Sequence, residues 1–174
     1  MNYNGSLYNS RSLRLYAERF LAVMDTHYPK VTRLISAGMS GGAIASAMLT
    51  LAPTGKDKEL THTHYYTQDN NASHRGHEKS ISGALPPLDY PIDVVIVDDI
   101  MCAGTTILAL KGRVLSSVNI VGVIIGRCYA GTQGLATEMG CPIHSVDNSE
   151  TYEPIAPPPT QTKLEGASAI PKEL

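Results

Sequence analysis

The chain has 174 residues, of which 43% are hydrophobic, and a formal net charge of -2. This supports a single domain over 1–174 and gives no electrostatic reason to expect nucleic acid or an anionic membrane as a partner. The start lacks a basic segment followed by an apolar stretch, and no apolar run approaches the roughly 18 residues of a membrane span. We therefore expect a cytoplasmic protein. The three cysteines lack CxxC spacing and predict no metal site.

The first half of the chain alternates helical and extended patterns. Near the start, apolar residues recur at three- and four-residue steps, which is typical of an amphipathic helix. Further on, β-branched and aromatic residues indicate a strand. The elements expected in this half are a helix over 10–25, a strand over 31–36, a glycine turn over 37–41, a helix over 42–52 and a strand over 61–67.

A polar segment over 68–83 separates the two halves. It has few apolar residues and many turn formers, so we expect a long exposed loop. Loops longer than about 12 to 15 residues in compact domains are commonly functional or disordered. This one carries His74, Arg75, His77 and Lys79, which favours a function.

The second half continues the alternation. Its expected elements are a strand over 92–98, a helix over 105–117, a strand over 120–126, a helix over 131–139 and a strand over 142–146. The run over 120–126 is continuously apolar, as in strands buried on both faces of parallel sheets. Alternating strands and helices predict an α/β fold with a mainly parallel, twisted sheet flanked by helices. The proline-rich tail should be irregular.

The strand over 92–98 leads into two adjacent acids and a turn of small residues. In open α/β sheets, ligands bind beyond the carboxyl ends of the strands. Asp98 and Asp99 are acceptors that suit the vicinal diol of a sugar. Residues 102–106 can place backbone N–H groups and threonine hydroxyls around a phosphate at a helix N-terminus. The pattern predicts a ribose 5-phosphate site, and the alternative is that the acids only cap a turn.

The segment over 94–107, VVIVDDIMCAGTTI, resembles the phosphoribosyl pyrophosphate (PRPP) signature of the type I phosphoribosyltransferases. ISAGMSGGAIASAM, over 35–48, is similar to the pyrophosphate loop of that family, and SHRGHEKSISG, over 73–83, resembles its flexible catalytic loop. The run over 121–146 is similar to orotate phosphoribosyltransferases. The resemblance covers about 31–147, with the terminal segments 1–30 and 148–174 left for a small hood or flanking elements.

The resemblance implies a role for residues in each of these segments. The ribose and 5-phosphate would be held by Asp98, Asp99, Cys102, Ala103, Gly104, Thr105 and Thr106. The pyrophosphate loop would consist of Ala37, Gly38, Met39, Ser40 and Gly41. Catalysis would use the acid pair together with Arg75, His77 and Lys79, and base binding would use Arg127 and Tyr152.

The resemblance also implies a reaction. A nucleobase, orotate or a purine, would displace pyrophosphate from C1 of PRPP through a transition state with oxocarbenium character. Mg²⁺ would be the cofactor, held mainly through substrate oxygens rather than by a dedicated carboxylate cage. A homodimer would be the functional form.

Two other functions compete with the transferase. GMSGG, over 38–42, fits the G-x-S-x-G pattern of serine hydrolases, with Asp98 or Asp99 and His144 following Ser40 in the order of that fold. The pattern is short, and a hydrolase function would give the phosphate-type turn over 102–106 no role. The second alternative is a non-catalytic PRPP- or nucleotide-binding regulator of the same fold. His62 and His64 alternate like metal ligands, but no third ligand is near them in the sequence, so they are expected to be strand residues.

Overall fold

The computed structural model describes residues 9–53, 59–65, 81–82, 91–101, 104–113, 118–128 and 131–156. Its helices are α2 (Ser10–His27), α3 (Gly38–Leu51), α4 (Thr105–Arg113) and α5 (Thr132–Met139). Its strands are β1 (Arg33–Ala37), β2 (Thr61–Tyr65), β3 (Ile81–Ser82), β4 (Ile92–Met101), β5 (Val118–Cys128), β6 (Ile143–Ser145) and β7 (Glu150–Tyr152).

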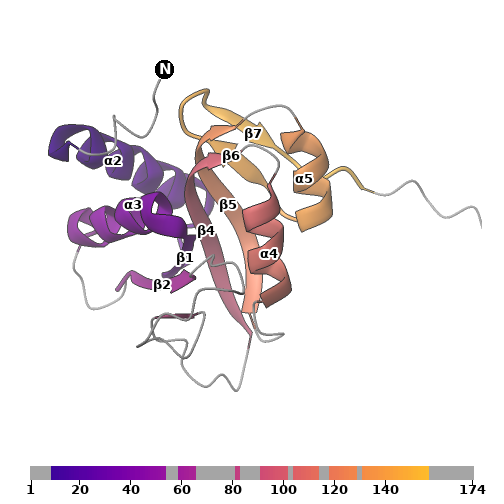
Figure 1. Cartoon of the computed structure of the whole chain (residues 1–174), viewed down its shortest axis with the longest axis horizontal. Coiled ribbons are helices and arrows are strands. Elements are labelled where there is room, and N and C mark those ends of the chain that lie inside the picture. The colour runs from indigo at the N-terminus through magenta and orange to yellow at the C-terminus, as the bar shows by residue number, and fades with distance from the viewer. Residues whose placement is uncertain are drawn as a thin grey trace, which may run out of the picture.

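The strands form one sheet in the order β3-β2-β1-β4-β5-β6-β7. The pairs from β2 to β6 are parallel, whereas β3 and β7 join the two edges in antiparallel orientation. Helices α2 and α3 cover one face of the sheet, and α4 and α5 cover the other (Figure 1). The expected α/β fold with a mainly parallel sheet is confirmed.

The central strand β4 supplies both halves of the core. Val94 and Ile96 belong to the cluster that packs under α4 and α5, while Val95 and Val97 belong to the cluster under α2 and α3. All four side chains are fully buried. A strand buried on both faces requires a continuous apolar run, because neither set of alternating side chains meets water.

Helix α2 is a structural layer of the domain. Its buried residues include Ala17 and Phe20, both with no exposed surface, and they pack in the same cluster as α3. The side chain of Asn9 caps the helix by accepting a hydrogen bond from the N–H of Ser12 at 2.8 Å. The described part of the N-terminal segment thus packs on the core of the domain. No helix in the described part of the chain is long and apolar enough to cross a membrane.

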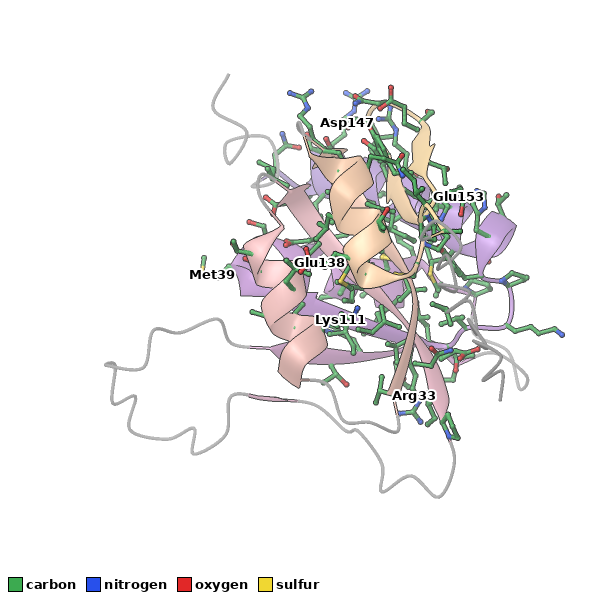
Figure 2. The ribbon with its side chains drawn as sticks, turned by 90° about the vertical axis from the view of Figure 1, so that its right-hand side faces the viewer. Arg33, Met39, Lys111, Glu138, Asp147 and Glu153 are labelled. Atoms are coloured by element: carbon green, nitrogen blue, oxygen red, sulfur yellow. The ribbon has the colours of Figure 1, made fainter. Side chains whose placement is uncertain are left out.

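A lysine joins the two helices on the opposite face. The Nζ atom of Lys111 on α4 donates to the backbone carbonyls of Glu138 and Met139, at 2.6 and 3.1 Å, at the end of α5 (Figure 2). A cation at a helix C-terminus satisfies carbonyl groups that have no partner within the helix. This contact fixes the position of α4, the helix that follows the acid pair.

Two local predictions were wrong. The glycine turn expected over 37–41 is shorter, because α3 begins at Gly38. Gly38 has φ of +68°, so one residue without a Cβ atom makes the bend and the helix follows at once. Of the loop expected over 68–83, only Ile81–Ser82 lies within the described residues, and there β3 pairs with β2.

Candidate functional site

The two acids lie near the carboxyl end of β4, between its neighbours β1 and β5. Asp98 and Asp99 are each only 9% exposed. The N–H of Asp99 donates to Oδ1 of Asp98 at 2.9 Å. Burial, and next the charge of Asp99, raise the pKa of Asp98 to about 8. The pair therefore holds a proton near neutral pH and can exchange it when a ligand donates hydrogen bonds to it.

The first turn of α3 packs directly against this pair. A Cβ atom at Gly41 would lie 3.0 Å from both Oδ1 of Asp98 and the carbonyl oxygen of Val97. The contact follows from topology, because β1 and β4 are parallel neighbours and α3 begins directly after β1. The structure thus brings the predicted pyrophosphate loop and the predicted ribose pair together. Met39, in the same turn, is 79% exposed and stands out from the ribbon (Figure 2).

The start of α4 forms another part of this edge. Gly104 has φ of +72°, and its carbonyl accepts the first helical hydrogen bond, from the N–H of Leu108 at 2.9 Å. A Cβ atom at Gly104 would lie 2.3 Å from the end of the Leu135 side chain on α5, and the positive φ favours glycine here. Thr105 is exposed and Thr106 half-buried at the beginning of the helix.

Several predicted site residues fall outside the described residues. These are Arg75, His77 and Lys79 of the predicted catalytic loop, and Cys102 and Ala103 of the predicted phosphate turn. The side chain of Ala37 also lies outside the described part. Their roles stay predictions from the resemblance.

Arg127, the predicted base-binding residue, lies next to the acid pair on β5. It pairs in register with Ile100 of β4. Its Nε atom lies 3.3 Å from Oδ2 of Asp147, whose other oxygen accepts a hydrogen bond from the hydroxyl of Tyr16 at 2.7 Å. Asp147 therefore holds Arg127 and links it to α2.

Asp147 and Tyr16 were not among the site residues predicted from the sequence. Asp147 follows the short strand β6, and the acid pair likewise follows the apolar part of β4. An acid directly after a strand was the feature of the sequence that could have identified Asp147. Its contact with Arg127 depends on the pairing of β5 with the chain after β6, where the N–H of Asp147 donates to the carbonyl of Gly126 at 2.9 Å. No sequence pattern encodes that pairing by itself.

Tyr152, the other predicted base-binding residue, lies three strands away from β4 on the edge strand β7. Its ring packs against the core cluster under α4 and α5. Its hydroxyl donates to Oε2 of Glu150, and this bond raises the pKa of the phenol to about 12. The contacts of Tyr152 are those of a packing residue.

His144 and His62 are engaged in hydrogen bonds within the sheet layers. His144 Nε2 lies 2.7 Å from the hydroxyl of Tyr28, and its Nδ1 lies 2.9 Å from Oγ1 of Thr151. With a hydroxyl partner at each nitrogen, His144 is not placed to activate Ser40, which argues against the serine hydrolase alternative. His62 Nε2 lies 2.7 Å from Oγ of Ser36 on the neighbouring strand.

The raised pKa of Asp98 predicts a change of stability with pH. Folded Asp98 keeps its proton up to about pH 8, whereas an aspartate in the unfolded chain loses it near pH 4. The folded state then binds more protons in this window, so the free energy of unfolding should fall as the pH rises from about 4 to about 8. Asp98→Asn should remove this loss, so its stability relative to the wild type should rise between about pH 4 and about pH 8.

Urea unfolding near pH 4 and pH 8 measures this effect. Asp93→Asn is the matched control, because Asp93 lies exposed at the other end of β4 and accepts a hydrogen bond from Asn119 at 2.8 Å. The difference in the free energy of unfolding between Asp98→Asn and wild type should change between the two pH values. A constant difference would contradict a raised pKa of Asp98.

Comparison with known proteins identifies the fold. A scan of protein-family models and a search of curated proteins give no match to this chain. Among solved structures, it is similar to orotate phosphoribosyltransferase from Francisella tularensis, with a TM-score of 0.62, 15% identity, and coverage of 80% of this chain and 68% of the other.

Two further structures show the same likeness. Orotate phosphoribosyltransferase from Mycobacterium tuberculosis in complex with PRPP matches with a TM-score of 0.61, 15% identity, and coverage of 84% of this chain and 78% of the other. Adenine phosphoribosyltransferase from Saccharomyces cerevisiae matches with a TM-score of 0.59, 12% identity, and coverage of 81% and 82%. The chain thus has the fold of the type I phosphoribosyltransferases.

Proposed function

We propose that the chain is a Mg²⁺-dependent phosphoribosyltransferase that transfers ribose 5-phosphate from PRPP to a nucleobase and releases pyrophosphate. The observation that carries the proposal is the buried pair Asp98 and Asp99 at the end of β4, in contact with the first turn of α3. In this fold, the adjacent carboxyl ends of β1 and β4 are where a ligand is expected to bind.

The residues of this edge have complementary tasks in the proposed reaction. Asp98 and Asp99 accept hydrogen bonds from the two ribose hydroxyls and orient the sugar. Backbone N–H groups at the starts of α3 and α4 provide partial positive charge for the pyrophosphate and the 5-phosphate. Positive charge that develops on the sugar ring in the transition state is favoured beside the carboxylates.

The protein groups fit a Mg²⁺ ion that is held mostly by the substrate. Carboxylate oxygens are ligands that Mg²⁺ prefers, and Asp98 and Asp99 supply them at this edge. In the described ranges no cluster of three or more His, Cys, Asp or Glu side chains gathers around a common point. When bound with PRPP, the ion would offset the charge of the leaving pyrophosphate.

The proposed acceptor is orotate or a purine. Arg127 supports orotate, because a guanidinium can bind a carboxylate, and Asp147 holds that guanidinium beside the carboxyl end of β4. The proposal extends to a homodimer in the cytoplasm, in keeping with the family that the sequence resembles.

Pyrophosphate release from PRPP and Mg²⁺ tests this function. The assay is run with orotate, uracil, adenine, hypoxanthine, guanine, xanthine and nicotinamide in separate reactions. Release that depends on one base establishes the transferase and names its acceptor. Binding of PRPP without release in any reaction would instead support the non-catalytic regulator.

A further inference from the structure

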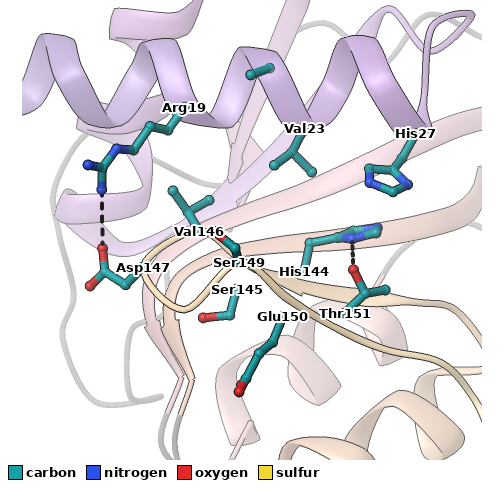
Figure 3. Close-up of a pocket in the computed structure, with 11 residues that line it drawn as sticks. Arg19, Val23, His27, His144, Ser145, Val146, Asp147, Ser149, Glu150 and Thr151 are labelled. Carbon is teal, nitrogen blue, oxygen red and sulfur yellow. Dashed lines mark hydrogen bonds and ion pairs between the residues drawn. The ribbon is translucent and has the colours of Figure 1, made fainter.

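A pocket lies between α2 and the hairpin formed by β6 and β7 (Figure 3). Its volume is about 460 Å³, within the range of roughly 300 to 1,000 Å³ that small-molecule sites occupy. Its lining comes from α2 and from residues 144–151, so neither the acid pair nor the turns at Gly38 and Gly104 take part in it.

One end of this pocket carries charge. Arg19 reaches from α2 toward Asp147, with NH1 4.0 Å from Oδ1 (Figure 3). Arg127 approaches the other carboxylate oxygen of Asp147 from outside the pocket. The two guanidinium groups balance the carboxylates of Asp147 and Glu150, and the N–H groups of Arg19 can donate to ligand groups that accept hydrogen bonds. The Asp147 carboxylate itself remains at this end and can accept from an N–H group.

The imidazole rings of two histidines line the other end of the pocket. The imidazoles of His27 and His144 lie with centroids 4.3 Å apart and planes inclined by 34°. His144 is held by hydroxyls at both nitrogens, from Tyr28 and Thr151. Burial, and next the neighbouring His27, lower the pKa of His144 to about 4. The imidazole of His144 is therefore uncharged near neutral pH, and its two hydrogen bonds fix its orientation without a ligand.

Aliphatic groups lie between the two ends. Val23 on α2 points toward the hairpin, and Val146 lies between the strand and the helix (Figure 3). Glu150 also lines the pocket. Its carboxylate accepts a hydrogen bond from Tyr152, whose ring packs against the core cluster under α4 and α5. The pocket thus offers aliphatic side chains, a wall of two imidazole rings, and one donor–acceptor pair at its end.

We propose that this pocket binds an uncharged, planar nitrogen heterocycle bearing ring carbonyls, of nucleoside size. The faces of the heterocycle would contact Val23, Val146 and the imidazole of His27. A ring carbonyl would accept from the Arg19 guanidinium, and an adjacent ring N–H would donate to Asp147. A phosphate group is disfavoured at this end because the Asp147 carboxylate would repel it. The lining shares no residue with the acid pair or with the turns at Gly38 and Gly104, so a ligand here would not use the groups proposed to hold PRPP.

Calorimetric titration of the full chain with uridine, inosine and adenosine tests the proposal. Uridine or inosine should bind with a dissociation constant below about 1 mM, and adenosine, which lacks a ring carbonyl, at least about tenfold more weakly. Val23→Trp fills the pocket and should weaken binding of the carbonyl nucleoside at least about tenfold. Leu15→Trp is the matched control, since Leu15 lies on the same helix, is 48% exposed and does not line the pocket.

The Asp98→Asn, Asp99→Asn double variant separates this site from the proposed function. It should bind the nucleoside as the wild type does, whether or not the wild type binds PRPP. Thermal unfolding of each variant confirms that it is folded. Absence of uridine and inosine binding would overturn the proposal. So would binding that is lost in the acid-pair variant and kept in Val23→Trp, because the nucleoside would then lie at the carboxyl edge.

Discussion

Replacing Asp98 and Asp99 together with asparagine is expected to weaken PRPP binding by at least about tenfold and to abolish base-dependent pyrophosphate release. Each acid would accept a hydrogen bond from a ribose hydroxyl, and a bond to one charged acceptor contributes about 1.5 to 3 kcal/mol. Asparagine has nearly the same shape, and Asp98 already holds its proton near neutral pH. The fold should therefore be kept. Calorimetric titration with PRPP and Mg²⁺ measures the loss.

Asp93→Asn is the control for this experiment as well. It makes the same chemical change on the same strand, but at the exposed amino end of β4. Its PRPP affinity should equal that of the wild type. An unchanged affinity in the Asp98 and Asp99 double variant would show that the pair does not contact the sugar.

Gly122→Ala is expected to destabilise the fold by about 3 kcal/mol, from overpacking and a lost hydrogen bond. A Cβ atom at Gly122 would lie 1.9 Å from the hydroxyl oxygen of Tyr28 and 2.2 Å from Cζ of the same ring. Tyr28 would have to move, and its hydrogen bond to His144 at 2.7 Å would break. Urea unfolding measures the change in the free energy of unfolding.

Two further variants make this prediction specific. Gly112→Ala is the matched control, because Gly112 lies on α4 with no atom within 4 Å of the added Cβ, and alanine there should stabilise the helix by about 0.5 to 1 kcal/mol. Combining Gly122→Ala with Tyr28→Ala should cost less than the sum of the single changes, since the clash is then absent. Equal stability of Gly122→Ala and wild type would contradict the packing described.

The elements around the acid pair could be predicted because local patterns encode them. The apolar run that ends in Asp98 and Asp99 predicts a buried strand. Its alternating side chains point to opposite faces of the sheet and pack into the two core clusters. The start of α3 was predicted too late, because a single positive φ at Gly38 replaces a longer turn. Edge strand β7 was missed, as its pairing with β6 is a tertiary feature of only three residues.

The candidate site could be predicted only in part, because some of its contacts join residues that are distant in sequence. Short motifs identify the acids and the glycines at the strand ends, and topology then brings Gly41 against Asp98. The partners of Arg127 come from residues that are distant in sequence, Tyr16 on α2 and Asp147 after β6. Such contacts follow from the order of strands in the sheet and from the packing of α2 on it, which no single segment specifies.

The most direct test of phosphoribosyl transfer is the rate of pyrophosphate release by the wild-type chain, with PRPP and Mg²⁺, in the presence and absence of each base. We expect release that depends on one base, with formation of the matching nucleotide, and none above background from the Asp98 and Asp99 double variant. Release that is equal with and without every base, or equal in the double variant, would contradict phosphoribosyl transfer at this edge of the sheet.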